Sequence, residues 1–238
     1  MITRRFLFIT WLMLTLVVGL QAKIYVVCVG IADYPGKSHD LQSSSADAAT
    51  IQNIYDKNGK AQTVLCLNTE ATIQQVCNLM ELTFSSATES DVITFYFSGH
   101  GVPGGFVFYD GILFYQAIVN IMKGSRAATR IVMADTCFSG DLRSSKEHTG
   151  KHTDTDVMFF LSSRDNEQSL EIKGWKNGLF TTYLARGLRG GADTNKDRII
   201  TAKELFTFVH EGVISKSRKR QHPVMWGNFS DNMSVIKW

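Results

Sequence analysis

The chain has 238 residues, 44% of them hydrophobic and 20% charged, with a formal net charge of +3. This composition is typical of a globular protein with a sizeable core, and the three prolines and the lack of a low-complexity tract argue against disorder. Residues 1–22 contain two arginines and no acid, so +3 minus these two charges leaves +1 for the rest of the chain. That nearly neutral charge gives no reason to expect nucleic-acid binding.

The N-terminus has the pattern of an export signal. Two arginines precede an uninterrupted apolar stretch at residues 6–20, and the small residue Ala22 follows shortly afterwards. This pattern predicts a signal peptide over residues 1–22 and an exported protein, periplasmic or secreted. The stretch is short for a membrane-spanning helix, which needs about 20 apolar residues. Because Leu20 is bulky for a residue near a cleavage point, an uncleaved membrane anchor remains the alternative.

From residue 23 onward, β-branched apolar runs alternate with amphipathic segments. We expect, in chain order, a strand at 24–30, a helix at 44–56, a strand at 62–67, a helix at 72–84, a strand at 91–97, a hairpin arm at 105–109, a helix at 115–122, strands at 130–134 and 157–161, helices at 179–188 and 202–213, and a last edge strand at 234–237. Repeated strand–helix units predict an α/β fold, with a mainly parallel sheet between helices. Nothing marks a second domain, so residues 23–238 are expected to form one.

Two of these strands end in residues that carry chemistry. FYFSGHG ends in His100 and Gly101, and MADTCFSG contains Cys137. The carboxyl ends of parallel strands are where α/β sheets present their active sites. An imidazole beside a thiol lowers the thiol pKa and carries its proton, which makes a nucleophile that attacks acyl bonds. The main-chain N–H groups of Gly101 and Cys137 are candidate donors to an oxyanion.

Each residue alone has an ordinary structural explanation. His100 could be a strand-end histidine bonded to the backbone, and Cys137 a packed thiol. No third member of a catalytic triad is evident. A Cys–His dyad suffices if the backbone orients the histidine.

FYFSGHG and ADTCFSG resemble the two signatures of the caspase-like cysteine peptidases, above all of the metacaspases and their bacterial relatives. The usual forms are Y-S-G-H-G and D-x-C-H-S-G. The segments YVVCVGIADY, SSSADAATI, SSRDNEQSLE and NGLFTTYLARGL are also similar to that family, so the resemblance spans the mature chain.

The resemblance implies a three-layer caspase-like fold, with a six-stranded, mostly parallel sheet between helices. It implies neighbouring strands for the two motifs, with His100 as the general base and Cys137 as the nucleophile. The chain departs from the family at Phe138, where a histidine is usual, and in the short interval between the two motifs.

The match to metacaspases also implies a primary specificity pocket. Asp47, Ser98 and Asp135 would line it, with Ser44 where metacaspases carry a cysteine. Two carboxylates favour a cationic side chain, so protein or peptide substrates with Arg or Lys before the scissile bond are expected. Asp47 has an alternative role. It could simply be an acid in the first turn of a helix, where its negative charge interacts favourably with the helix dipole.

The segment 141–156 follows the candidate nucleophile directly. It is polar throughout and lacks periodicity, which is typical of an exposed loop. A basic substrate preference makes its cations, Arg143, Lys146 and Lys151, candidate self-cleavage sites.

Residues 193–204, DTNKDRIITAKE, match the spacing of an EF-hand calcium loop. The oxygen ligands would be Asp193, Asn195, Asp197 and Glu204. The sixth position, which favours glycine for a sharp turn, is Arg198. The alternative is that Thr201 and Glu204 simply form a capping box for the helix that follows. The dyad itself requires no cofactor, and Ca²⁺ at this loop is the one ion that the sequence suggests.

The sequence therefore predicts an exported cysteine endopeptidase with a preference for Arg or Lys. Two alternatives remain open. The chain could be a catalytically inactive caspase-like scaffold or binding module, although such modules tend to lose one residue of the pair. The glycine-rich GHGVPGG could instead cradle a phosphate, but it lacks the established phosphate-loop patterns.

Overall fold

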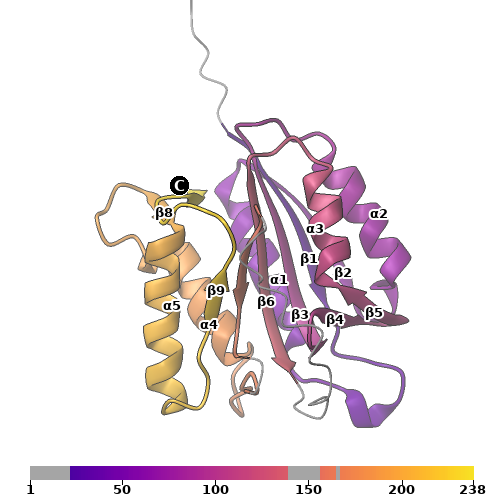
Figure 1. Cartoon of the computed structure of the whole chain (residues 1–238). Coiled ribbons are helices and arrows are strands. Elements are labelled where there is room, and N and C mark those ends of the chain that lie inside the picture. The colour runs from indigo at the N-terminus through magenta and orange to yellow at the C-terminus, as the bar shows by residue number, and fades with distance from the viewer. Residues whose placement is uncertain (1–21, 139–155, 165–166) are drawn as a thin grey trace, which may run out of the picture.

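A six-stranded sheet forms the centre of the molecule, with its strands in the order β2-β1-β3-β6-β7-β9 (Figure 1). The computed structural model describes residues 22–138, 156–164 and 167–238. The strands are β1 (Ile24–Gly30), β2 (Ala61–Leu67), β3 (Val92–Val102), β6 (Thr129–Phe138), β7 (Met158–Leu161) and β9 (Val224–Trp226). The first five strands in that order pair in parallel, and β9 pairs antiparallel with β7. The expected six-stranded, mostly parallel sheet is confirmed.

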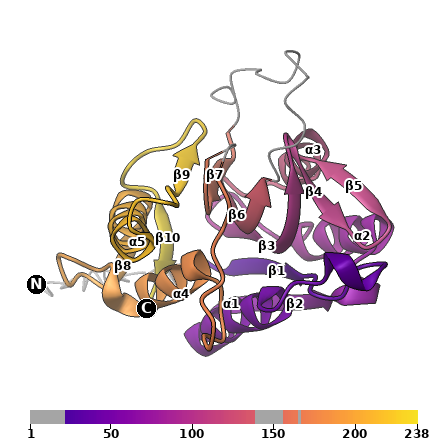
Figure 2. The ribbon, with the colours of Figure 1, turned by 90° about the horizontal axis from the view of Figure 1, so that it is seen from below.

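Helices cover both faces of this sheet, so the molecule has three layers (Figure 2). The helices are α1 (Ser44–Asn58), α2 (Ile73–Phe84), α3 (Tyr115–Lys123), α4 (Leu179–Arg186) and α5 (Ala202–Ser217). One apolar cluster joins the sheet to α2 and α3, and a second joins its other face to α1, α4 and α5. The predicted α/β class with helices on both faces is confirmed.

Strand β1 illustrates why the sheet is buried on both sides. All seven of its residues are buried. Because side chains alternate along a strand, Tyr25 and Val27 pack toward α2 and α3, whereas Ile24 and Val26 pack toward the other helices. A continuous β-branched run suits such a position, and each fully buried valine or isoleucine contributes about 1.5–3 kcal/mol through removal of apolar surface from water.

The two strands that carry the candidate catalytic residues are longer than their sequence pattern predicts. The apolar runs end at Phe97 and Ala134, but β3 continues to Val102 and β6 to Phe138. Ser98, Gly99 and Gly101 of the first motif adopt extended backbone and stay paired with Asp135, Thr136 and Phe138 of β6. The candidate catalytic residues therefore lie within a hydrogen-bonded ladder and not in free loops.

The C-terminal part of the fold differs from the expectation. Residues 234–237 do form a strand, β10, but it pairs with β8 (Ile199–Thr201) in a separate two-stranded sheet. The edge of the central sheet is instead β9, whose three residues are too few to give a periodic signal. The prediction of a strand at 234–237 is therefore right, but its assignment to the edge of the central sheet is wrong.

A hairpin extends the carboxyl end of β3. The predicted arm at 105–109 is β4 (Gly105–Phe108), which pairs with β3 and with β5 (Gly111–Phe114). Residues 1–21, the body of the predicted signal peptide, lie outside the described residues. Within the described part of the chain, no helix combines the length and the apolarity that a membrane crossing needs.

Candidate active site

The parallel register of β3 and β6 sets His100 directly opposite Cys137. The same register pairs Ser98 with Asp135 and Gly101 with Phe138. Neighbouring strands of a sheet lie about 4.8 Å apart, so the two residues leave the backbone side by side. For Cys137 and Phe138 the structure describes the backbone alone. The two strand-end motifs are thus brought together at one edge of the sheet, as the sequence predicted.

The His100 imidazole is oriented by a main-chain group. Its Nε2 atom lies 2.7 Å from the carbonyl oxygen of His39, the last residue of a short helical turn at Lys37–His39. A carbonyl oxygen only accepts, so Nε2 carries the proton and Nδ1 is left as the basic nitrogen of the neutral ring. This contact supplies the backbone orientation that a dyad without a third side chain requires.

Tyr34 holds the backbone around His100. Its hydroxyl accepts a hydrogen bond from the His100 N–H at 2.9 Å and donates one to the Val107 carbonyl at 2.9 Å. The two rings lie 4.7 Å apart between centroids. Burial raises the pKa of Tyr34, so its hydroxyl stays protonated and able to donate. A Cβ atom at Gly99 would lie 2.5 Å from this hydroxyl, which explains a glycine there.

A narrow cavity of about 30 Å³ lies beside the two strand ends. All four residues predicted to form the specificity pocket line it: Ser44, Asp47, Ser98 and Asp135. Its other lining residues are Leu41, Gly99, Thr136, Ser169, Leu170, Glu171 and Gly178. We call this cavity the acidic pocket.

Asp47 lies in the first turn of α1, and its side chain is 1% exposed. One carboxylate oxygen accepts hydrogen bonds from Asn177 Nδ2 at 2.9 Å and from the Gly178 N–H at 3.0 Å. The other accepts from Ser98 Oγ at 2.9 Å. Asp47 therefore occupies both of the positions predicted for it, the first turn of a helix and the lining of the pocket.

Asp135 reaches the pocket from β6 and is also buried. Its Oδ1 accepts a hydrogen bond from Ser169 Oγ, and its Oδ2 accepts from the N–H and the hydroxyl of Thr181 at 3.0 and 2.7 Å. Tyr96 donates in turn to the Thr181 hydroxyl at 2.6 Å. Three donors thus fix the orientation of this carboxylate.

Two buried carboxylates at one cavity disfavour their own ionisation. Burial raises the pKa of Asp47, and the nearby charge of Asp135 raises it further. Burial also raises the pKa of Asp135. Within the described residues, no lysine or arginine forms an ion pair with either group. A cationic guest would therefore find two acceptors without a counter-charge.

Residues from the far end of the chain support one wall of the pocket. The buried Gln221 donates to the Ser162 carbonyl at 2.9 Å and to Ser169 Oγ at 3.1 Å, and it accepts from the Leu170 N–H at 2.9 Å. Gly178 packs so closely that a Cβ there would lie 2.6 Å from Asp135 Oδ2. Sequence reasoning did not identify this wall, because each contact joins segments far apart in the chain.

The predicted calcium loop is described in full. Asp193 accepts hydrogen bonds from the N–H groups of Asp197 and Arg198 at 3.2 and 3.0 Å, and Arg198 has a left-handed φ of 67° despite its side chain. The capping box of Thr201 and Glu204 is present. Burial of Glu204 opposes its ionisation, but hydrogen bonds from Thr201 and Thr194 outweigh that effect and lower its pKa.

A grouping of acidic, histidine or cysteine side chains around an ion is a separate question from this hydrogen-bonded loop. Across residues 22–138, 156–164 and 167–238, no three His, Cys, Asp or Glu side chains are grouped as metal ligands. The candidate self-cleavage residues Arg143, Lys146 and Lys151 lie outside the described residues.

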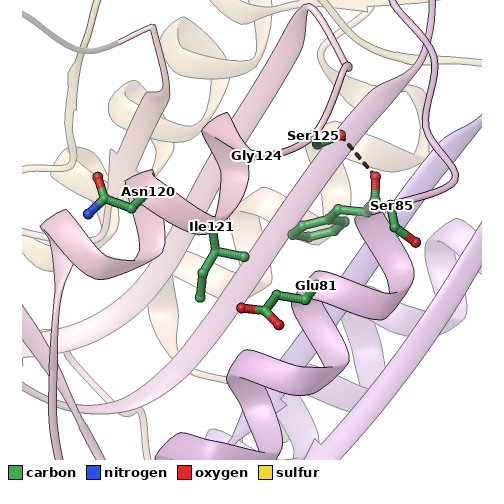
Figure 3. Close-up of a pocket in the computed structure, with 7 residues that line it drawn as sticks. Glu81, Ser85, Asn120, Ile121, Gly124 and Ser125 are labelled. Atoms are coloured by element: carbon green, nitrogen blue, oxygen red, sulfur yellow. Dashed lines mark hydrogen bonds between the residues drawn. The ribbon is translucent and has the colours of Figure 1, made fainter.

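A larger hollow of about 450 Å³ lies between the C-terminal ends of α2 and α3 (Figure 3). It is lined by Glu81, Phe84, Ser85, Asn120, Ile121, Gly124 and Ser125. These helix ends lie near the amino ends of the strands, at the opposite edge of the sheet from His100. Its lining includes neither an imidazole nor a thiol, so the candidate active site remains at the carboxyl edge.

Comparison with known proteins agrees with the resemblance to caspase-like proteins. The family model of the caspase domain matches residues 23–233. Protein GSU0716 from Geobacter sulfurreducens is similar in structure, with a TM-score of 0.65 and 18% sequence identity over 87% of this chain and 95% of that one. Caspase-1 from Spodoptera frugiperda is similar with a TM-score of 0.63 and 13% identity, over 87% of this chain and 86% of that one. No curated protein matches the sequence.

Proposed function

The chain belongs to the caspase-domain family of cysteine peptidases, and on that premise we propose that it is an endopeptidase with a Cys137–His100 dyad. The observation that carries the proposal is the register of β3 and β6, in which these two residues stand opposite each other. The His39 carbonyl supports it, because that contact leaves Nδ1 of His100 as the basic nitrogen.

The proposed reaction proceeds in two steps. The Cys137 thiol gives its proton to Nδ1 of His100, and the thiolate attacks the carbonyl carbon of the scissile peptide bond. The N–H groups of Gly101 and Cys137 donate to the oxyanion that forms. His100 then protonates the leaving amine, and a water molecule hydrolyses the thioester with His100 as the base.

The proposed substrates are proteins or peptides with Arg or Lys before the scissile bond. The acidic pocket supports this preference, because Asp47 and Asp135 line it without a described cationic partner. A cation that enters the pocket would form charge-assisted hydrogen bonds with both carboxylates.

Export and calcium binding are further proposals about this chain. Residues 1–22 have the signal-peptide pattern, so the mature protein would begin at Lys23 outside the cytoplasm, and an uncleaved segment would instead anchor it to a membrane. Mass determination of the protein recovered from its native compartment decides between a start at Met1 and a start at Lys23. The loop 193–204 has the EF-hand spacing, and we propose Ca²⁺ as its ion.

The experiment that tests the proposed function is an assay of purified residues 23–238 on fluorogenic peptides ending in Arg, Lys or Asp, with and without Ca²⁺. Cys137→Ala and His100→Ala are the matched controls. Turnover of the Arg or Lys peptides that both substitutions abolish supports the proposal. Absence of Cys137-dependent turnover on all the peptides would overturn it in favour of an inactive caspase-like binding module, in which Phe138 accompanies the loss of activity.

A further inference from the structure

Two exposed apolar side chains lie close together on β5, in the hairpin at the carboxyl end of β3 (Figure 1). Across residues 22–138, 156–164 and 167–238, three large hydrophobic side chains are exposed, Leu82 by 73%, Ile112 by 44% and Phe114 by 50%. Leu82 lies on α2, whereas Ile112 and Phe114 are two positions apart in one strand and project from the same face. Apolar side chains scattered singly over a surface are ordinary, whereas adjoining ones can form a binding surface.

The strand register places this face on the same side of the sheet as the His100 side chain. Phe97 packs toward α2 and α3, so the alternation along β3 directs His100 and Val102 to the other side. Val102 pairs with Gly105, and Gly105 pairs with Phe114. Because directly paired residues project from the same face, Phe114 lies on the side of His100.

Two further residues belong to this face. Val107 pairs with Ile112, and each lies two positions from a member of the pair Gly105–Phe114. We call the four apolar side chains on this face the apolar strip: Val102, Val107, Ile112 and Phe114. The two valines are half-buried. The apolar strip thus runs from the strand that carries His100 to the outer edge of the hairpin.

The hairpin is fixed relative to His100. The Tyr34 hydroxyl accepts from the His100 N–H and donates to the Val107 carbonyl, both at 2.9 Å, so it joins β3 to β4 beside the imidazole. On the inner face of the hairpin, Phe106 stacks on Phe97 with 4.6 Å between the ring centroids. The apolar strip is therefore a preformed surface at a set distance from His100.

The apolar strip and the acidic pocket lie on opposite sides of β3. Gly101 pairs with Phe138 of β6 and with Phe106 of β4, so these two strands flank β3. Asp135 of the acidic pocket is on β6, whereas the hairpin begins at β4. A substrate whose basic side chain enters the acidic pocket would therefore continue past His100 toward the hairpin.

The proposed reaction determines which part of the substrate lies there. His100 protonates the amine of the leaving segment, the part of the substrate that follows the scissile bond, so this segment begins within hydrogen-bonding reach of the imidazole. Neighbouring strands lie about 4.8 Å apart, which puts β5 about 10 Å from β3. An extended chain advances about 3.3 Å per residue, so roughly three residues of the leaving segment cover that distance.

We infer that the apolar strip binds the leaving segment and selects an apolar side chain at the second to fourth residue after the scissile bond. This inference rests on the proposed peptidase function. Contact with Ile112 and Phe114 would remove such a side chain from water. The apolar strip has no charged member to pair with an ionic side chain, so a charged residue at these positions would lose hydration without compensation.

The test uses internally quenched peptides that share one Arg before the scissile bond and carry either Leu-Phe-Leu or Ser-Gln-Ser at the second to fourth positions after it. The native chain should hydrolyse the apolar peptide with a kcat/KM about fivefold or more above that of the polar one, as for partial burial of an apolar side chain. The double variant Ile112→Thr/Phe114→Ser should bring this ratio close to one.

The double variant is designed to keep the local structure. Threonine favours a strand, and serine is a preferred residue at the N-cap of α3, the position that Phe114 occupies. Leu82→Gln is the matched control, because it also removes an exposed apolar side chain, from a helix in which glutamine is well tolerated. It should keep the native ratio.

Equal ratios in the native chain and the double variant overturn the inference, while turnover of either peptide leaves the proposed function standing. If the native chain hydrolyses neither peptide, fluorescence anisotropy of the labelled peptides on Cys137→Ala, with and without the two substitutions, decides. Tighter binding of the apolar peptide that the substitutions remove supports the apolar strip as the binding surface, and equal affinity or no binding refutes it. A native dimer that the double variant dissolves in sedimentation velocity would overturn the inference in favour of contact between two copies of this chain.

Discussion

The Nε2 atom of His100 lies 2.7 Å from the main-chain oxygen of His39. The contact uses one imidazole and one carbonyl, so the side chain of His39, which is exposed, takes no part in it. Replacement of that side chain and disturbance of its backbone should therefore have different consequences.

His39→Ala is expected to leave kcat within roughly twofold of the native value, as for an ordinary surface substitution. Gly36→Ala should lower it more, because Gly36 has a φ of 92°, and a side chain there adds about 1–3 kcal/mol of backbone strain to the turn that carries the carbonyl. Steady-state kinetics on an Arg peptide checks both. Equal loss in the two variants would contradict the assignment of the contact to the backbone.

Tyr34→Phe should lower both stability and turnover. Phenylalanine keeps the ring against His100 but leaves the His100 N–H and the Val107 carbonyl without their partner. Unsatisfied buried groups cost about 1–3 kcal/mol, so the denaturation midpoint should fall along with kcat. Urea unfolding and kinetics measure the two effects. Tyr109→Phe, whose hydroxyl has no described hydrogen bond, is the control, and a similar loss there would count against the role of Tyr34.

Asp47→Asn should raise stability at neutral pH while it lowers turnover of basic peptides. A carboxyl whose pKa is higher in the folded chain than in the unfolded chain stabilises the fold at low pH, and this contribution is lost as pH rises through the folded pKa. Asparagine has no charge to bury, so its advantage should be greatest above that pKa and shrink on acidification. Denaturant unfolding between about pH 5 and 8 tests the sign. An advantage that grows as pH falls would be the contrary result.

Gln221→Ala should weaken the pocket from a distance. It removes the partner of the Ser162 carbonyl, the Leu170 N–H and Ser169, the residue that donates to Asp135. We expect a loss of about 1–3 kcal/mol in unfolding free energy for the buried groups left unpaired, and a higher KM for Arg peptides. Gln168→Ala, an exposed glutamine of the same segment, should change neither.

Calcium should raise the thermal midpoint if the loop at 193–204 binds it. Ligand at 100 times its Kd adds about 2.7 kcal/mol to the free energy of unfolding. Asp193→Asn should abolish that increase, whereas Thr201→Ala should lower the midpoint with or without calcium, because it removes only the helix cap. Thermal scans in Ca²⁺ and in chelator separate the two effects. No shift with Ca²⁺ would leave the loop as a capping structure alone.

The parts of the fold that could be predicted are those in which one segment alone determines the outcome. The sequence predicts strand β1 with its observed bounds, because a short, continuous β-branched run such as IYVVCVG is typical of a strand buried on both faces. The ends of β3 and β6 were placed too early, since glycine and serine usually break a strand, and only pairing between the two keeps them extended. Strand β9 was missed because three residues carry no period.

The residues of the candidate site also fall into two groups, those that local sequence indicates and those that only the folded chain brings together. His100 and Cys137 were identified from local motifs, and the four pocket residues from the family resemblance. The donors that orient the two pocket acids come from segments far along the chain: Ser169 and Thr181 lie 34 and 46 positions from Asp135, and Asn177 lies 130 positions from Asp47. They share no local pattern with the acids that they orient. Their roles follow only from the folded arrangement.

The close approach of Gly178 to Asp135 means that one methyl group there would lie against the Asp135 carboxylate, in the space that the proposed basic side chain would occupy. The backbone at Gly178, with φ of −54° and ψ of 158°, is one that alanine readily adopts. Alanine at this position would therefore place no demand on the backbone and would instead press on the Asp135 carboxylate in the acidic pocket. If the pocket has the proposed specificity, the absence of that one carbon atom is what keeps it open to a basic side chain.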